Sequence, residues 1–189
     1  MILAMDIGNT NVVMGCIDDD NIYFEARLAT DHNRTYEQYA VELKSILELY
    51  NIDPAQIEGS IISCVVPPIT SLAKRAVELV IKKEPLIVGP GVKTGLDIKT
   101  DNPAQLGSDL VVGAVAAISK YRTPLIIFDL GTATTVSVIN ENKTFLGGAI
   151  VPGVNVSLNA LINTTSQLQK ISIENPSIVV GTNTIDSMK

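Results

Sequence analysis

The sequence has few of the residues that several common kinds of site require. Its 189 residues include no Trp, a single His and only two Cys. One His leaves a zinc site or a Ser-His-Asp relay little to be built from, and His32 lies in a polar stretch expected to be a solvated loop. Cys16 and Cys64 lie in apolar, strand-like runs without the spacing of a metal site or a disulfide framework. We therefore expect two buried, reduced thiols, as is usual in the cytoplasm.

The sequence also lacks a basic run and a long apolar run. Lys and Arg number 14 against 20 Asp and Glu, for a formal net charge of −6, and no basic residues alternate with aromatics. We therefore expect no nucleic-acid partner. No apolar stretch approaches the roughly 20 residues of a membrane span, and the first residues lack the basic region of a signal peptide. These absences predict a soluble, cytoplasmic protein with no membrane partner.

The most informative feature that is present is a repeated segment. Residues 6–13, DIGNTNVV, return in similar form as residues 129–136, DLGTATTV. Each copy follows an apolar run, residues 1–5 and 124–128, and a further apolar run follows each copy. Self-similarity of this kind indicates two related structural units. Each repeat is expected to be a strand, a glycine turn and a returning strand.

The residue types in these turns suit phosphate and metal ions. Glycine lets the backbone come close to a ligand, and neighbouring N–H groups with Thr or Asn side chains can donate to phosphate oxygens. An Asp at the strand end repels bare phosphate, but it suits a phosphate that is reached through a magnesium or alkali ion. Two such turns facing one another would clamp a polyphosphate with its metal. The alternative is a pair of ordinary hairpins.

Hydrophobic periodicity predicts an α/β architecture for the first unit, which we place at residues 1–118. The expected elements, in chain order, are strands at residues 1–5, 12–17 and 22–28 with a turn at 18–21, a helix over 36–50 capped by Thr35, a strand at 61–66, a helix after Pro67 and Pro68 that buries Leu79 among others, and a strand at 86–88. Residues 92–105 are polar and are expected to form a loop with ligand contacts. A third helix is expected to begin near residues 107–109, with Ser108 as its cap. The alternative is an earlier turn that starts at Asn102 and Pro103.

The second unit, at residues 119–189, repeats this order but is shorter. The pattern predicts three strands ending near residues 128, 139 and 151, a helix from Gly153, a strand at 178–180 and a helix cap at 182–184. Because the chain ends within this pattern, we expect the second unit to be a truncated copy.

These features resemble the superfamily of acetate and sugar kinases, Hsp70 and actin. Its fold is a pair of ribonuclease H-like (actin-like ATPase) β-β-β-α-β-α units. Within the superfamily, the sequence is similar to the type III pantothenate kinases. Five segments carry the likeness: residues 6–11, 102–109, 129–135, 147–153 and 181–188. As a set these segments are specific, and they extend over the whole chain.

The resemblance implies a kinase, a transferase that phosphorylates pantothenate with ATP to 4′-phosphopantothenate in the first step of coenzyme A biosynthesis. It also implies a homodimer that uses Mg²⁺ and a monovalent cation, K⁺ or NH₄⁺. In this reading Asp109 is the base that accepts the hydroxyl proton of pantothenate, and Asp129 binds the monovalent cation. The implied ATP contacts are Asp6, Ile7, Gly8, Asn9, Thr10, Asn11, Val12, Val13 and Thr132. The implied substrate contacts are Thr100, Gly107, Ser108, Asp109, Leu110 and Thr184.

Elementary chemistry agrees with the role of Asp109, because a carboxylate in the first turn of a helix is stabilised by the helix dipole. A plain capping role is the alternative. Three positions depart from the family pattern: Leu110 stands where relatives usually have Arg, Ser108 where they have Ala, and Thr100 where many have Tyr. Loss of the Arg removes a cation from beside the substrate, so weaker substrate binding is expected.

Two other functions stay open at this point. One is a non-catalytic, nucleotide-binding or regulatory member of the same family, which the Leu110 departure and the short second unit favour. The other is a kinase for a different acid or sugar, which would need inserted substrate-binding segments that the sequence lacks. A chain with an incomplete second unit is also expected to be inactive as it stands.

Overall fold

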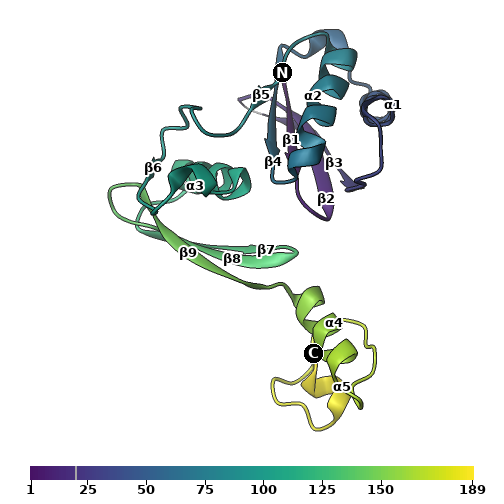
Figure 1. The fold of residues 1–189 in the computed structure, drawn as a ribbon, viewed down its shortest axis with the longest axis vertical. Coiled ribbons are helices and arrows are strands. Elements are labelled where there is room, and N and C mark those ends of the chain that lie inside the picture. The colour runs from purple at the N-terminus through teal and green to yellow at the C-terminus, as the bar shows by residue number, and fades with distance from the viewer. Residues whose placement is uncertain (20) are drawn as a thin grey trace. The chain divides into compact units, whose positions relative to one another are not determined.

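The computed structural model describes residues 1–19 and 21–189 (Figure 1). The chain divides into two compact units, Met1–Leu125 with Ile139–Gly147, and Ile126–Val138 with Gly148–Lys189. The division predicted after residue 118 stays a prediction. The turn predicted at residues 18–21 includes Asp20, which lies outside the described residues.

A five-stranded sheet with two helices forms the main part of the first unit. Its strands are β1 (Ile2–Ile7), β2 (Asn11–Ile17), β3 (Ile22–Ala29), β4 (Gly59–Cys64) and β5 (Leu86–Ile87), in the order β3-β2-β1-β4-β5. Strand β1 pairs antiparallel with β2 and parallel with β4. Helix α1 (Tyr36–Leu49) connects β3 to β4, and α2 (Pro67–Ile81) connects β4 to β5. The predicted order β-β-β-α-β-α is confirmed for this unit.

Local sequence signals account for the helix starts. Thr35 and Gln38 form the predicted capping box, in which the Thr35 hydroxyl accepts from the Gln38 N–H at 3.4 Å and the Thr35 N–H donates to the Gln38 side chain at 2.8 Å. Both hydrogen bonds satisfy backbone N–H groups that have no partner within the first turn of the helix. Helix α2 begins at Pro67, because proline lacks the N–H that a first helical position would leave unpaired.

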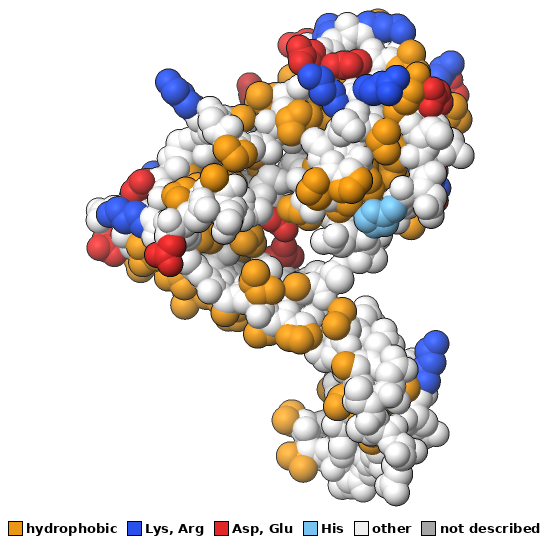
Figure 2. Space-filling model, in the orientation of Figure 1, with side chains coloured by type: hydrophobic (Ala, Val, Ile, Leu, Met, Phe, Trp, Pro, Cys, Tyr) orange, Lys and Arg blue, Asp and Glu red, His pale blue; other side chains and the backbone are white. Residues whose placement is uncertain are grey.

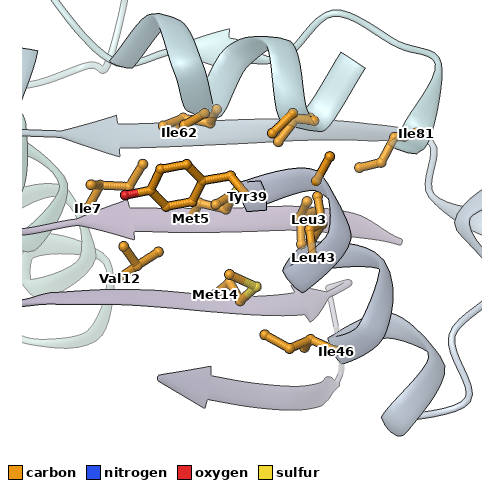
Figure 3. Packing of buried hydrophobic residues seen from close by; sticks show 14 of the residues in the cluster. Leu3, Met5, Ile7, Val12, Met14, Tyr39, Leu43, Ile46, Ile62 and Ile81 are labelled. Carbon is orange, nitrogen blue, oxygen red and sulfur yellow. The ribbon is translucent and has the colours of Figure 1, made fainter. Parts of the chain in front are cut away.

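The core of the first unit lies between one face of the sheet and helices α1 and α2. Alternate residues of β1 and β2 point into it, and α1 contributes side chains at three-and-four spacing. Figure 3 shows this packing for Leu3, Met5, Ile7, Val12, Met14, Tyr39, Leu43, Ile46, Ile62 and Ile81. The prediction that Leu79 is buried is wrong, since the buried stripe of α2 runs through Ile69, Ala73, Ala76, Val77 and Ile81 and turns Leu79 outward.

The polar stretch after β5 contains a short strand that the sequence did not predict. Strand β6 (Asp97–Ile98) pairs in parallel with the first part of β9 (Thr144–Pro152), and a 3₁₀ turn follows at Pro103–Gln105. Two residues are too few to show a strand period. Helix α3 (Ser108–Lys120) then begins, close to the predicted position.

The second half of the chain contains a second sheet. Strands β7 (Leu125–Leu130), β8 (Ala133–Ile139) and β9 give the order β6-β9-β8-β7, and helices α4 (Val154–Thr164) and α5 (Thr184–Ser187) follow. Hydrophobic side chains are exposed over this sheet (Figure 2), among them Ile126, Phe128 and Leu130 of β7. Within residues 1–19 and 21–189, no helix has the length and hydrophobicity required to span a bilayer.

The strand predicted at residues 178–180 is wrong. These residues form bends, Val179 is fully exposed, and no strand of the described chain pairs with them. A strand needs a neighbour for its backbone N–H and C=O groups, and local composition alone could not show that none is present. The helix cap predicted near residue 183 is confirmed, because the Asn183 side chain accepts from the Asp186 N–H at 2.9 Å.

Candidate active site

The first glycine turn is anchored on two sides. The Gly8 N–H donates to the Asn11 carbonyl at 2.9 Å, which closes the β1–β2 hairpin. Thr30, just past β3, donates its hydroxyl to the Gly8 carbonyl at 2.7 Å and its N–H to the Thr10 carbonyl at 2.9 Å. Asn9 and Thr10 are exposed at the tip. The turn therefore has a fixed backbone and presents polar groups to solvent.

Asp6 lies near the carboxyl end of β1, directly beside Ser63 of the parallel strand β4. Ser63 is buried, and its hydroxyl donates to the hydroxyl of Ser108 at 3.1 Å. The N–H of Cys64 donates to the same Ser108 oxygen, also at 3.1 Å. These two bonds fasten the start of α3 to the carboxyl end of β4.

Asp109 follows Ser108 in the first turn of α3. Its Oδ1 accepts a hydrogen bond from the Leu110 N–H at 2.8 Å. Gly107 precedes the helix, and a Cβ at that position would lie 2.3 Å from Asp109 Oδ1, so the glycine leaves room for the carboxylate. The prediction that Ser108 caps the helix is wrong. Gly107 is the N-cap, and the Ser108 hydroxyl accepts a hydrogen bond from the end of β4 instead.

A series of neighbouring residues links Asp6 to Asp109, which are far apart in the sequence. Asp6 neighbours Ser63, Ser63 bonds to Ser108, and Asp109 is the next residue. Ligands of open α/β sheets bind outside the carboxyl ends of parallel strands. Asp6 lies near such an end, and the start of α3 is hydrogen-bonded to the end of the neighbouring strand β4. Sequence reasoning missed Ser63, although it was a polar residue within the apolar run 61–66.

A cavity of about 650 Å³ lies beside the start of α3. One wall is the segment from Val88 to Ile98, and the other runs from Pro103 to Val111 and includes Ser108. Thr100 is not among the lining residues, and its buried hydroxyl has no hydrogen-bond partner in the described part of the chain. The size fits a small organic substrate.

The second glycine turn supports the start of α4. The Gly131 N–H donates to the Ala133 carbonyl at 3.1 Å, and the Gly153 N–H donates to the Thr132 carbonyl at 3.1 Å. A Cβ on Gly153 would lie 2.3 Å from the Gly131 oxygen and 2.5 Å from the Thr132 oxygen, so α4 approaches the turn more closely than a side chain allows. Asp129 and Thr132 are exposed in this second unit, as is Thr184 at the start of α5.

The carboxylates of the site suit a metal ion that takes most of its ligands from a bound phosphate and water. Among the described residues, no group of three or more His, Cys, Asp and Glu side chains could hold a metal ion. Magnesium in phosphate-transfer sites usually has one or two carboxylates and takes its remaining ligands from phosphate and water. Asp6 and Asp129, each near the end of the strand before its turn, offer single carboxylates of that kind.

Comparison with known proteins gives close relatives in sequence. The chain is 43% identical to a type III pantothenate kinase of Exiguobacterium sp. and 45% identical to one of Halalkalibacterium halodurans, over all of this chain and 74% of each relative. It is 44% identical to a type III pantothenate kinase of Bacillus cytotoxicus, over all of this chain and 72% of that relative.

Solved structures show the fold. A protein described as a Baf family transcriptional activator from Campylobacter jejuni matches with a TM-score of 0.56 and 19% identity, over 98% of this chain and 71% of that one. A protein described as a 2-dehydro-3-deoxygalactonokinase from Sinorhizobium meliloti matches with a TM-score of 0.56 and 13% identity, over 87% and 57%. Together with the element order, these likenesses confirm the predicted ribonuclease H-like fold class. A family model described as type III pantothenate kinase matches residues 2–189, and the chain belongs to the type III pantothenate kinase family.

Proposed function

We propose that the chain catalyses the phosphorylation of pantothenate by ATP to 4′-phosphopantothenate, the first step of coenzyme A biosynthesis, in the cytoplasm. Membership of the family supports this activity. The observation that supports it most directly is the hydrogen bond between Ser63 and Ser108, because Ser63 neighbours Asp6 on parallel strands and Ser108 precedes Asp109. Phosphoryl transfer mainly requires positioning and neutralisation of charge, with a carboxylate to orient the attacking hydroxyl.

Asp109 is the base in this proposal. The Leu110 N–H occupies Oδ1, so Oδ2 is the oxygen that accepts the proton of the substrate hydroxyl. Asp109 lies in the first turn of α3, and a general base must lie within hydrogen-bond reach of the proton that it accepts. Substrate contacts come from Gly107, Ser108 and Leu110 around it, with Thr100 and Thr184 as further contacts that rest on the resemblance alone.

The glycine turns bind ATP. In the first turn, the backbone N–H groups and side chains of residues 6–13 would contact the phosphates, and the Asp6 carboxylate would hold Mg²⁺. When bound, Mg²⁺ neutralises the negative charge of the phosphates. Thr132 of the second turn is a further ATP contact, and Asp129 holds the monovalent cation, K⁺ or NH₄⁺. A homodimer is also part of this proposal, and the resemblance alone supports it.

The test is product formation by the purified protein with ATP, Mg²⁺, K⁺ and pantothenate. Mass spectrometry should detect 4′-phosphopantothenate, and omission of K⁺ or Mg²⁺ should abolish its formation. A sugar offered in place of pantothenate should give no product. Calorimetry tests the non-catalytic alternative, which predicts that ATP binds while pantothenate neither binds nor is turned over. No observation on the described residues favours that alternative.

A further inference from the structure

The cavity beside α3 has one charged lining residue. Its walls are mostly apolar, with Val88, Leu96 and Val111 among the residues that line them, and Lys93 alone carries a charge among the described lining residues. An apolar cavity with a few placed polar groups is the usual form of a small-molecule site. Such a cavity with one cation and no anion favours a ligand that carries a single negative charge.

No carboxylate of the described residues pairs with Lys93. Within residues 1–19 and 21–189, no salt bridge or side-chain hydrogen bond involves its ammonium group. The residue is exposed, so the long side chain can turn toward the mouth of the cavity. An unpaired ammonium at the edge of an apolar cavity is placed to bind an anionic ligand group.

The loop that carries Lys93 has a defined shape. Gly91 and Gly95 have φ values of 93° and 78°, in the left-handed region that side chains disfavour, and they stand two residues before and after Lys93. The Val92 N–H donates to the Gly89 carbonyl at 3.1 Å, and the Leu96 N–H donates to the Thr94 hydroxyl at 3.4 Å. Two local turns thus hold the backbone of Lys93 on the wall formed by residues 88–98.

The two walls of the cavity differ in the way that the two ends of the proposed substrate differ. Ser108, which precedes Asp109, lines the wall of residues 103–111, and Lys93 belongs to the other wall. Pantothenate has its reacting hydroxyl at one end and a carboxylate at the other, with an apolar dimethyl group between them. Its hydroxyl therefore belongs with Asp109, and its carboxylate needs a cation elsewhere on the cavity, since Leu110 beside the base is uncharged.

We propose that Lys93 binds the carboxylate of the substrate and so makes the enzyme selective for an acid over its neutral analogue. This inference rests on the proposed function, because it takes pantothenate as the substrate. Lys93 is a specificity-determining residue in this account and takes no part in proton transfer. Its contribution belongs to substrate binding, in the ground state and the transition state alike.

The experiment compares pantothenate with panthenol, which has an alcohol in place of the carboxylate. Lys93→Met keeps the apolar stem and removes the charge. It should raise the KM for pantothenate about tenfold, as for loss of one charged hydrogen bond, with little change in kcat. The KM of panthenol, or its inhibition constant where it is not turned over, should stay the same. Lys93→Arg should restore most of the affinity for pantothenate.

Lys99→Met is the matched control, because Lys99 lies in the same part of the chain but does not line the cavity. It should leave the KM for pantothenate near that of the unmodified protein. An unchanged KM in Lys93→Met would overturn the inference, as would an equal rise for pantothenate and panthenol, which indicates a structural role. If the unmodified protein neither binds nor phosphorylates pantothenate, the proposed function itself fails, and that result differs from both.

Discussion

The hydroxyl of Ser63 donates to the hydroxyl of Ser108 at 3.1 Å, although the two residues are 45 positions apart in the sequence. Both side chains are buried, and the Cys64 N–H donates to the same Ser108 oxygen. Because Ser63 is the strand neighbour of Asp6 and Ser108 precedes Asp109, this contact links the strand that carries Asp6 to the helix start that carries Asp109.

Ser108→Ala should destabilise the protein and slow the reaction. The substitution leaves the Cys64 N–H and the Ser63 hydroxyl without an acceptor in a buried place, which costs about 1–3 kcal/mol of the free energy of unfolding. Ser63→Ala removes only one of the two bonds and should cost about 1 kcal/mol. Urea denaturation measures both, and kcat should fall more in Ser108→Ala because Asp109 loses its anchor. Equal, negligible effects of the two substitutions would contradict this role.

Ser60→Ala should be neutral or stabilising. Ser60 is only 7% exposed, and its hydroxyl has no hydrogen-bond partner among the described residues. A buried hydroxyl without a partner costs free energy, so its removal should raise the free energy of unfolding by up to about 1 kcal/mol. Ser63→Ala is the comparison on the same strand, with the opposite sign expected. A loss of stability in Ser60→Ala as large as in Ser63→Ala would show that the hydroxyl is bonded after all.

Much of the fold of the first unit could be predicted because its signals are local. The capping pair Thr35 and Gln38, the double proline at the start of α2 and the apolar runs of β1, β2 and β4 each act within a few residues. The strands that were predicted wrongly or missed depend on partners that are distant in the sequence. The segment 178–180 has the composition of a strand but pairs with no strand in the described part of the chain, and β6 exists only because β9 lies beside it.

The site shows the same division. Residue types predict the two glycine turns, and the resemblance implies the role of Asp109; both stay predictions. Ser63, by contrast, owes its place to the strand register beside Asp6 and to its contact with Ser108. The predicted role of Ser108 is wrong for the same reason. A serine at a helix start is typical of a cap, but here its hydroxyl accepts a hydrogen bond from the Cys64 N–H at the end of β4. Register and tertiary contacts of this kind cannot be read from spacing.

Gly153→Ala should damage the second glycine turn. The backbone at Gly153, with φ −68° and ψ 166°, suits alanine, so the effect is purely steric. The new Cβ would lie within 2.5 Å of two backbone oxygens, those of Gly131 and Thr132, which cannot turn away as a flexible side chain can. We expect a loss of about 3 kcal/mol in stability and weaker ATP binding, measured by thermal unfolding and calorimetry.

Gly113→Ala is the matched control for that experiment. Gly113 lies inside α3, where nothing stands within 4 Å of the added Cβ. Alanine is the better helix former, so this variant should gain about 0.5–1 kcal/mol. A Gly153→Ala protein as stable as Gly113→Ala would show that α4 does not pack on the turn as described.

The free energy of unfolding should fall as the pH rises from 9 to 11, and Cys16 should account for part of the fall. Cys16 is fully buried, and this burial raises the pKa of its thiol from 9.0 to about 11. Between these values the unfolded chain loses the proton while the folded protein keeps it, so deprotonation favours unfolding and stability declines with pH. Below pH 9 the thiol is protonated in both states, and its contribution does not change.

Cys16→Ala tests this pH dependence. The variant is less stable at neutral pH because it leaves a small cavity, but its stability should decline less steeply between pH 9 and 11. Chemical denaturation at several pH values measures both slopes. Parallel slopes for the two proteins would show that the Cys16 thiol does not titrate differently in the folded and unfolded states.

The central claim is that Asp109 accepts the proton of the pantothenate hydroxyl during transfer from ATP. The most direct test is kcat for 4′-phosphopantothenate formation by Asp109→Asn, beside Asp101→Asn as an exposed control carboxylate on the preceding loop. Asp109→Asn should lower kcat by about 10²- to 10⁴-fold with little change in thermal stability, whereas Asp101→Asn should stay near the unmodified rate. An Asp109→Asn enzyme that turns over pantothenate as fast as the unmodified protein would contradict it.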